Sequence, residues 1–286
     1  GDFAYDGVIS LAVPSTVTLT DTVSGNVARG VTLNGVISGT SPLSVIGWNR
    51  TKVLTLTNTG STFSGGINID SNGVLQVTAD SNGTGAININ NGGTLTGAAT
   101  ISNSVNLNDA GILSPAGKIT IGIGGNLACA STGVMSFDLN TPSDTADDEL
   151  QVNGNATVAG TVNVVAGAGF GVGTYLLISG TSITNSGLIL GTLPVGYSGS
   201  LSFTPTQVTL NVTPQTTYRW SGSVSSNFNN ANNWVPAGIP NSGDALVFGD
   251  TANFTTLNNN FPDVRTFFSV TFDNSGFVLD GTGIAI

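Results

Sequence analysis

The stretch Ile87-Asn-Ile-Asn-Asn-Gly-Gly-Thr-Leu95 recurs at nearly constant spacing through the middle of the chain. Gap-free copies occupy residues 67–75 and 105–113, and a looser copy occupies residues 127–135. Each copy combines a short alternating strand pattern, a polar turn that ends in Gly, and a second short strand. A period of about 20 residues of this kind is typical of a solenoid, in which each repeat stacks on the next.

The alternation within each copy predicts which side chains face the interior. Residues one and three of a strand share a face, so Ile87 and Ile89 point inward and Asn88 points outward. We expect each to stack on its counterparts in neighbouring copies, and the Asn residues to form hydrogen-bonded ladders. A second inward stack is expected from Leu75, Leu95, Leu113 and Met135. The Asn- and Asp-rich turns favour left-handed backbone conformations.

Composition supports an all-β fold. The chain of 286 residues has 40 Gly, only 8% charged residues and 39% hydrophobic residues. Good helix formers are scarce, whereas Val, Ile, Thr and Asn suit strands and turns. We predict a right-handed parallel β-helix (β-solenoid) for residues 1–213, a junction at 214–217 and an aromatic-rich β segment at 218–286. At about 20 residues and 4.8 Å per coil, this amounts to about 14 coils and a rod of roughly 65 Å.

The charge and the missing residue types exclude several functions. A formal net charge of −10 argues against nucleic acid and against anionic membrane surfaces as partners. No histidine is present, so triads and metal sites that need His are impossible. No apolar run approaches the length of a membrane helix, so we expect no membrane insertion. Cys129, the single cysteine, aligns with Leu107 and is expected to be a buried hydrophobe.

One acidic loop, at residues 138–150, is the candidate site for chemistry. It contains Asp138, Asp144, Asp147, Asp148 and Glu149. The favoured interpretation is a solvated loop. One alternative is a calcium site formed by Asp144, Asp147, Asp148 and Glu149. Another is a carboxylate pair for glycoside cleavage, as in a β-helical polysaccharide lyase or hydrolase. No EF-hand spacing is present. Beyond possible calcium we expect no cofactor.

The C-terminal aromatic residues and a glycine-rich stretch have plainer interpretations. Trp220, Trp234 and the surrounding Phe residues suit core packing better than sugar stacking. Residues 167–173 carry Gly at alternate positions, but no helix follows, so a loop is favoured over a dinucleotide fingerprint.

Two stretches resemble the autotransporter-associated β-strand repeat proteins of bacterial surfaces. The first runs from Gly39-Thr-Ser-Pro-Leu-Ser-Val through Lys52-Val-Leu-Thr-Leu-Thr-Asn and Thr62-Phe-Ser-Gly-Gly-Ile-Asn-Ile to Gly73-Val-Leu-Gln-Val77. The second is Asp148-Glu-Leu-Gln-Val-Asn-Gly, followed by Ala159-Gly-Thr-Val-Asn-Val164. The pattern departs from the family where Ser44-Val-Ile-Gly-Trp replaces Lys-Thr-Gly. The resemblance implies export and display outside a bacterial cell as an adhesin, stalk or fibre.

The order of the segments suggests how such units join. Tyr218-Arg-Trp-Ser-Gly and Ser269-Val-Thr-Phe272 are similar to the family's opening segment, yet they follow a closing one. Both termini have strand character, without an evident cap, so we expect assembly through Phe3, Tyr5, Ile284 and Ile286. The predicted partner is the protein itself, as a head-to-tail homopolymer or a covalent tandem array that forms an extracellular filament. The alternative is a displayed adhesin that binds a glycan or another surface ligand.

Overall fold

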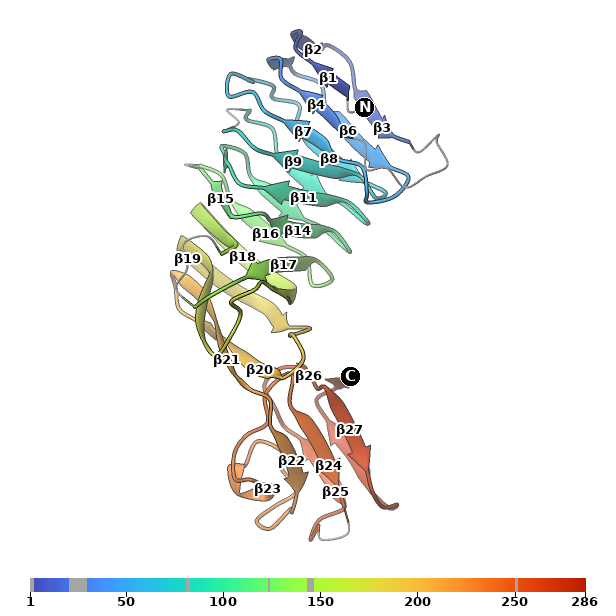
Figure 1. Cartoon of the computed structure of the whole chain (residues 1–286), viewed down its shortest axis with the longest axis vertical. Helices are drawn as coiled ribbons and strands as arrows, with labels where there is room; N and C mark the ends of the chain where they lie inside the picture. The colour runs from blue at the N-terminus through green and yellow to red at the C-terminus, as the bar shows by residue number, and fades with distance from the viewer. Residues whose placement is uncertain (1–2, 21–29, 81–82, 123, 143–146, 250–251) are drawn as a thin grey trace.

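The computed structural model describes residues 3–20, 30–80, 83–122, 124–142, 147–249 and 252–286. Within these ranges the protein is all-β, with one short 3-10 turn at Ala231–Asn233 as its only helical element. No helix in this part of the chain is long and apolar enough to cross a membrane. The strands stack into an elongated solenoid, with the N-terminus at one end and an aromatic-rich segment at the other (Figure 1).

The chain winds into three-sided coils whose strands pair in parallel with those of the neighbouring coils (Figure 1). The first face stacks β1 (Phe3–Tyr5), β4 (Val31–Leu33), β7 (Leu54–Leu56), β9 (Val74–Val77), β11 (Thr94–Gly97), β14 (Ile112–Pro115) and β17 (Val134–Leu139). The second face includes β2 (Ile9–Leu11), β5 (Ile37–Gly39), β12 (Thr100–Ile101) and β15 (Lys118–Ile121). The third face stacks β3 (Ser15–Leu19), β6 (Leu43–Gly47), β8 (Ile67–Asp70), β10 (Ile87–Ile89), β13 (Val105–Leu107) and β16 (Leu127–Cys129).

Two long strands close this main solenoid, which we define as β1 to β19. Strand β18 (Glu149–Ala166) pairs in turn with β15, β16 and β17, and therefore runs past all three faces. Strand β19 (Gly173–Leu190) follows it in parallel, with irregularities where the chain turns a corner. Asp138 and Leu139 belong to β17, so the acidic loop is shorter than the sequence suggested.

The predicted inward stacks are present. Ile87 pairs with Ile67 and Val105, and Ile89 pairs with Ile69 and Leu107. The second stack also has the expected register, and its members are at most 1% exposed: Leu75, Leu95, Leu113 and Met135. Since every coil repeats the same inward positions, the aliphatic core is continuous along the solenoid axis.

Outward Asn side chains form two hydrogen-bonded ladders, as expected. In the first, Asn106 Nδ2 donates to Asn88 Oδ1 at 2.8 Å and Asn88 Nδ2 donates to Asn68 Oδ1 at 2.9 Å. The second joins Asn108, Asn90 and Asp70 through two bonds of 2.7 Å. These bonds link three successive coils by side chains as well as by the backbone.

The repeat glycines are required by close approach. A Cβ at Gly93 would overlap the carbonyl oxygen of Ile69, and one at Gly111 would overlap that of Ile89. The left-handed residues lie in the preceding turn positions, among them Asn72, Gly92 and Ala110. Glycine therefore ends each turn because the coil before it leaves no room for a side chain.

Residues 197–214 depart from the predicted parallel β-helix. Strand β21 (Gln207–Pro214) lies antiparallel to both β19 and β20 (Tyr197–Phe203). A tight turn joins β20 to β21, because Thr204 N donates to Gln207 O and Thr204 Oγ1 accepts from Gln207 N. The turn sends the chain back along its own edge, so the prediction of parallel coils up to residue 213 is wrong for this hairpin.

The aromatic-rich segment is itself coiled. Strands β22 (Thr217–Trp220), β24 (Ala245–Phe248) and β27 (Ser269–Phe272) form one parallel face. The other faces pair β25 (Thr256–Asn259) with β28 (Val278–Gly281), and β26 (Arg265–Thr266) with β29 (Ile284–Ala285). The short strand β23 (Trp234–Val235) pairs with β22 in the antiparallel sense. We call residues 217–286 the C-terminal coils.

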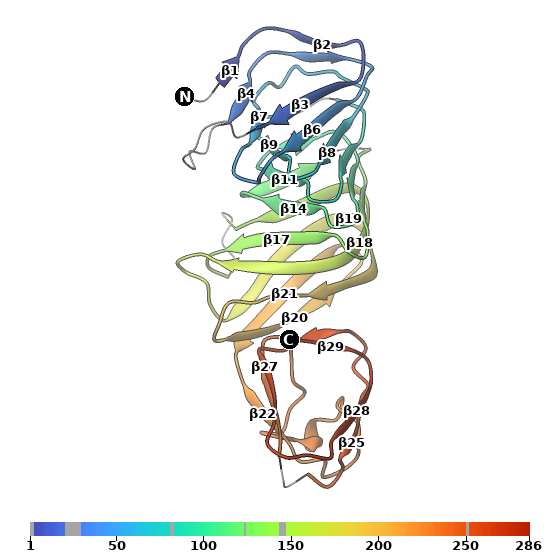
Figure 2. The same cartoon turned by 90° about the vertical axis from the view of Figure 1, so that its right-hand side faces the viewer.

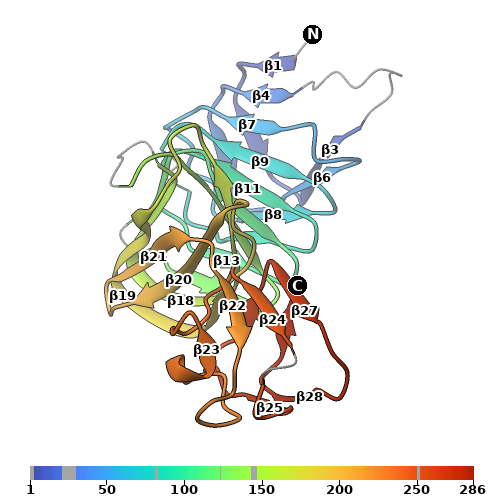
Figure 3. The same ribbon diagram turned by 60° about the horizontal axis from the view of Figure 1, so that its bottom comes forward.

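The C-terminal coils stack across the direction of the main solenoid. In Figure 1, β22, β24 and β27 lie side by side across the long axis, and Figure 2 shows the same coils as a ring. Figure 3 gives a third view of their position below β20 and β21. The described part of the chain makes about 11 turns, fewer than the expected 14. Coils outside the central repeat are longer than the expected period, as in the turn that leads from Phe3 to its register partner Val31.

Two hydrophobic clusters lie on either side of residues 214–217. The aliphatic cluster extends to Val212, and the aromatic cluster begins at Trp220. The division into domains at this junction stays a prediction.

Candidate functional site

The acidic loop uses its carboxylates to bind backbone amides. Asp148 Oδ1 accepts from Gly117 N at 2.6 Å, and Oδ2 accepts from Asp138 N at 2.7 Å. Asp147 Oδ1 accepts from Asn140 N at 2.5 Å. Both aspartates are buried, with exposed fractions of 3% and 7%. The loop is therefore not simply solvated, because Asp148 attaches it to the preceding coil at Gly117 and both side chains bind amides at the loop's own start.

Burial dominates the electrostatics at this loop. It raises the pKa of Asp148 to about 6, and the two backbone hydrogen bonds oppose the shift only in part. Nearby Asp138 and Asp147 raise it further. Glu149 lies 3.0 Å from the Lys118 ammonium and accepts a 2.6 Å hydrogen bond from Ser179 Oγ.

The predicted calcium ligands are thus partly committed to other contacts. Asp147 and Asp148 bind amides, Glu149 is paired, and Asp144 lies outside the described residues. Over the described ranges no group of three or more His, Cys, Asp or Glu side chains is arranged to hold a metal ion. The calcium site stays a prediction. The same amide contacts leave Asp147 and Asp148 poorly placed as a catalytic pair.

The predicted assembly residues lie at the two ends of the coiled chain. Phe3 and Tyr5 are 59% and 42% exposed, although their register partners Val31 and Leu33 show that they face the core side of β1. Ile286 is 79% exposed, whereas Ile284 packs partly against the aromatic cluster. Assembly through these residues stays a prediction.

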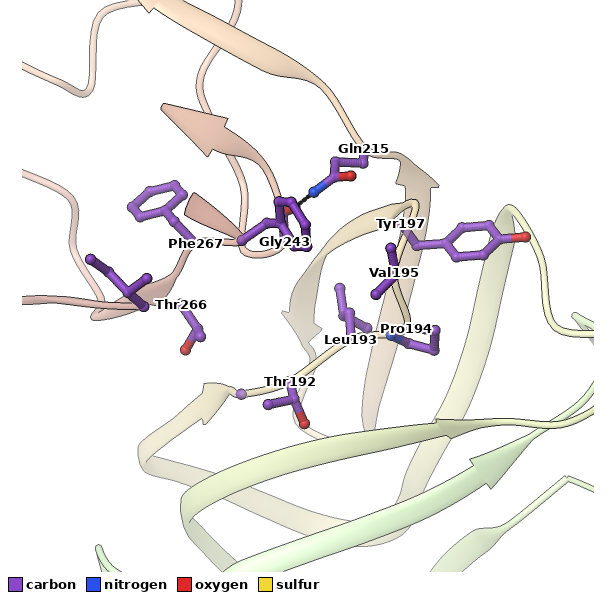
Figure 4. A pocket seen from close by; sticks show the side chains of 12 residues that line it. Thr192, Leu193, Pro194, Val195, Tyr197, Gln215, Gly243, Thr266 and Phe267 are labelled. Carbon is purple, nitrogen blue, oxygen red and sulfur yellow. Dashed lines mark hydrogen bonds between the residues drawn. The ribbon is translucent and has the colours of Figure 1, made fainter. Parts of the chain in front are cut away.

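A pocket lies between residues 191–197, which follow β19, and the C-terminal coils (Figure 4). It encloses about 160 Å³ and is mostly apolar. Its wall includes Leu193, Pro194, Val195, Tyr197, Phe267, Phe268 and Ile286. Gln215 Nε2 donates to Gly243 O at 2.7 Å across the same junction. The pocket brings the C-terminal residue Ile286 against a loop much earlier in the chain, a contact that no local pattern indicated.

A second recess runs along the outer surface of the first face. It has a volume of about 390 Å³ and is formed by outward side chains of β9, β11, β14, β17 and β18, with Arg50 at one end. Its lining residues are Arg50, Val74, Thr94, Thr96, Ile112, Ser114, Val134, Ser136 and Asn163. We call it the axial groove. Sequence analysis missed it, although the polar alternate positions of each strand, such as Thr94 and Thr96, were the available signal.

The cysteine and the tryptophans separate into buried and exposed groups. Cys129 pairs with Leu107 as predicted, but it is half-buried against the aliphatic cluster and not fully buried as expected. Its partial burial raises the pKa of the thiol to about 11. Trp220 and Trp234 are at most 1% exposed and pack edge to face with ring centroids 4.9 Å apart, which confirms their core role. Trp48, in the segment that departs from the family pattern, is 76% exposed.

Comparison with known proteins shows a similarity to a bacterial surface protein. No protein-family model matches the chain. Over 129 residues, or 42% of this chain, it is 34% identical to the adhesin BmaC autotransporter of Brucella suis biovar 1 (strain 1330). The resemblance to β-helical autotransporter passengers is confirmed. The matched region is 4% of the length of that relative.

Proposed function

We propose that this chain is a structural segment of a surface-displayed β-solenoid passenger, and that its end coils stack on further coils to build an extended fibre. The main observation behind this proposal is that apolar side chains on the core side of the first and last coils are exposed. The similarity to an autotransporter adhesin supports export to the cell surface and a non-enzymatic role.

The N-terminal edge, formed by β1, β2 and β3, exposes apolar side chains of the kind that are buried between coils elsewhere. Phe3 continues the inward row of Val31 and Leu54, and Tyr5 continues the row of Leu33. Buried members of these rows, such as Leu54, are fully covered by the next coil. Covering an aromatic side chain of this kind stabilises an assembly by about 1.5–3 kcal/mol.

The C-terminal edge, formed by β27, β28 and β29, presents a matching pattern. Val270 and Phe272 continue the buried pair Leu246 and Phe248, and Phe272 is 48% exposed. Leu279 continues the row of buried Leu257. Both edges are three-sided and parallel, so stacking β27 on β1 would place Phe272 beside Tyr5 and continue the core without a break.

Such a fibre would bend at each unit. The C-terminal coils stack across the main solenoid, so units joined at these edges change direction once per unit (Figure 1). The edge that stacks on β1 or β27 comes either from a covalently linked unit or from a separate copy of the chain. Both would present the same edge strands.

Electron microscopy and sedimentation of the chain at increasing concentration test stacking between copies. We expect kinked particles longer than one unit, and single units for Tyr5→Asp and for Phe272→Asp. Val172→Asp, which changes a 56% exposed valine away from both edges, is the matched control. A wild-type chain that stays a single unit at all concentrations would overturn stacking between separate copies.

Two copies joined in one chain test the covalent form. We expect the joined pair to unfold at a higher temperature than the single unit, and Tyr5→Asp in the second copy to remove the gain. Independent unfolding of the two copies at the original temperature would contradict a covalent stack as well. Protease treatment of intact producing cells tests display, because a surface solenoid is cleaved without lysis.

A second candidate function is adhesion. The similar Brucella protein is named an adhesin, and the axial groove supplies a recessed surface on this chain where a ligand can lie. Apart from Phe3 and Tyr5 at the open edge of β1, the described strands of the first face carry no exposed aromatic side chains that would favour stacking of sugars.

A further inference from the structure

The axial groove is built from two parallel rows of side chains. The first row stacks Val74, Thr94, Ile112 and Val134 in strict register. The second row stacks Thr96 on Ser114, and Ser136 on Asn163. With neighbouring strands about 4.8 Å apart, the groove spans about 19 Å along the solenoid from β9 to β18.

The first row is apolar and recessed. Val74 is only 6% exposed although it points outward, and Ile112 and Val134 are half-buried. Thr94 interrupts the row, and its Oγ1 is buried and makes no hydrogen bond within the described structure. A buried hydroxyl that lacks a partner is costly, so Thr94 is the least satisfied polar group of this row.

The second row carries hydroxyl and amide groups that are left available. Neither Ser114 nor Ser136 makes a side-chain hydrogen bond to another described residue, in contrast to the saturated Asn ladders on the third face. Asn163 Oδ1 accepts from Thr192 N at 3.0 Å, which leaves its amide protons for a ligand.

One charged side chain, that of Arg50, lines the groove. Arg50 reaches over two coils and donates from Nε to Gly92 O at 3.3 Å. The other lining residues are uncharged, in a chain with a net charge of −10. An acidic polymer would be attracted by one cation, Arg50, and repelled by the negative charge of the rest of the protein. A neutral polymer is not subject to that repulsion.

We infer that the axial groove binds a linear neutral glycan that lies along the solenoid axis. A sugar ring has an apolar face, which suits the Val/Ile row, and hydroxyl groups at its edge, which suit the Thr/Ser/Asn row. Because both rows are straight and span several coils, the ligand is an extended chain of several sugars. The inference rests on the adhesion candidate and is independent of end-to-end stacking.

Titration with six-sugar probes tests the groove. The probes are the linear hexamers of β-linked glucose, β-linked N-acetylglucosamine and α-linked glucose, with an acidic galacturonate hexamer for comparison. The protein is the full chain carrying Tyr5→Asp, so that assembly does not alter binding. We expect at least one neutral hexamer to bind, and its two-sugar fragment to bind at least tenfold more weakly.

Charge substitutions locate the site. Ser114→Glu together with Ser136→Glu should weaken binding of the neutral hexamer at least tenfold, and Arg50→Ala should weaken it a few-fold. Thr120→Glu on β15 is the matched control, because Thr120 is equally half-buried and points outward from the second face. Failure of all neutral probes, a preference for the acidic hexamer, or equal binding by the Ser114/Ser136 variant would overturn the inference.

The outcome separates this inference from the structural proposal. If no hexamer binds while the wild-type chain still forms kinked fibres, the groove is not a glycan site and the stacking proposal stands. If a hexamer binds in the groove and no fibre forms, adhesion is supported in place of the structural role.

Discussion

The central repeat of the main solenoid and the C-terminal coils both stack coils around an apolar core, but they fill that core with different side chains. The central coils, which carry Leu75 to Met135 in register, are short, and their core is aliphatic. The C-terminal coils need a longer stretch of chain for each turn, as from Tyr218 to its register partner Leu246, and they enclose a cluster of Trp and Phe rings. Uniform aliphatic side chains suit a repeating stack, whereas the large rings of the C-terminal coils pack together as one cluster.

The two regions also use polar side chains differently. In the central repeat, Asn residues hydrogen-bond to identical residues in the neighbouring coils. In the C-terminal coils, the buried Asn233 instead accepts from Val224 N and Ser225 N and donates to Asn227 O within one long loop. Ladders join coils to each other, and Asn233 holds a single coil in shape.

The largest effect is expected from a substitution that disrupts only the aromatic cluster of the C-terminal coils. Trp220→Ala should destabilise the C-terminal coils by about 3–5 kcal/mol, because Trp220 is fully buried against Phe228, Trp234 and Phe248. Denaturation followed by fluorescence of the remaining buried tryptophan should shift, while the main far-UV transition should not. Phe254→Ala, at a 42% exposed ring, is the control. A single shifted transition in both signals would show that the two regions unfold as one.

The next effect concerns the coil that carries the acidic loop. Because the pKa of Asp148 is raised to about 6 in the folded protein, its protonated form favours folding. This stabilisation is fully present below about pH 4 and is lost as pH rises through 6, a change on the order of 2–3 kcal/mol. Thermal unfolding at pH 4 and 7 should show a clearly smaller loss in Asp148→Asn than in the wild type, and the remainder includes Asp244, whose pKa is also raised by burial. Asp280→Asn is the control and should keep the pH dependence of the wild type. If Asp148→Asn kept it as well, the loss of stability would arise from another group.

A smaller effect tests the tight spacing of the central coils. Gly93→Ala should cost about 1–3 kcal/mol, because the added Cβ overlaps the carbonyl oxygen of Ile69 in the coil before it. Gly283→Ala, in the C-terminal coils, meets no atom within 4 Å and should be nearly neutral. Chemical denaturation compares the two. Equal stability of both variants would mean that neighbouring coils can shift apart without cost.

The smallest effect concerns calcium at the acidic loop. Since Asp147, Asp148 and Glu149 already have partners, addition of millimolar calcium should change the unfolding temperature by less than about 1 °C relative to a chelator. A rise of several degrees that disappears in Glu149→Gln would instead establish the calcium site predicted from the sequence.

The sequence by itself determined the repeating part of this protein. The copies around Ile67, Ile87 and Val105 predicted the inward rows, the Asn ladders and the position of Cys129, because a two-residue alternation and a fixed period leave one self-consistent stack. The buried role of Trp220 and Trp234 followed from the density of aromatic residues around them.

Only the tertiary structure decided the features that depend on distant segments. The antiparallel pairing of β21 with β19, the change of stacking direction before β22 and the amide contacts of Asp148 involve partners that no period relates. The axial groove has the same origin, since Thr96 and Ser114 become one row only after their two coils are in register. Local pattern sets which side of a strand a residue faces, and the packing of whole coils sets what it meets there.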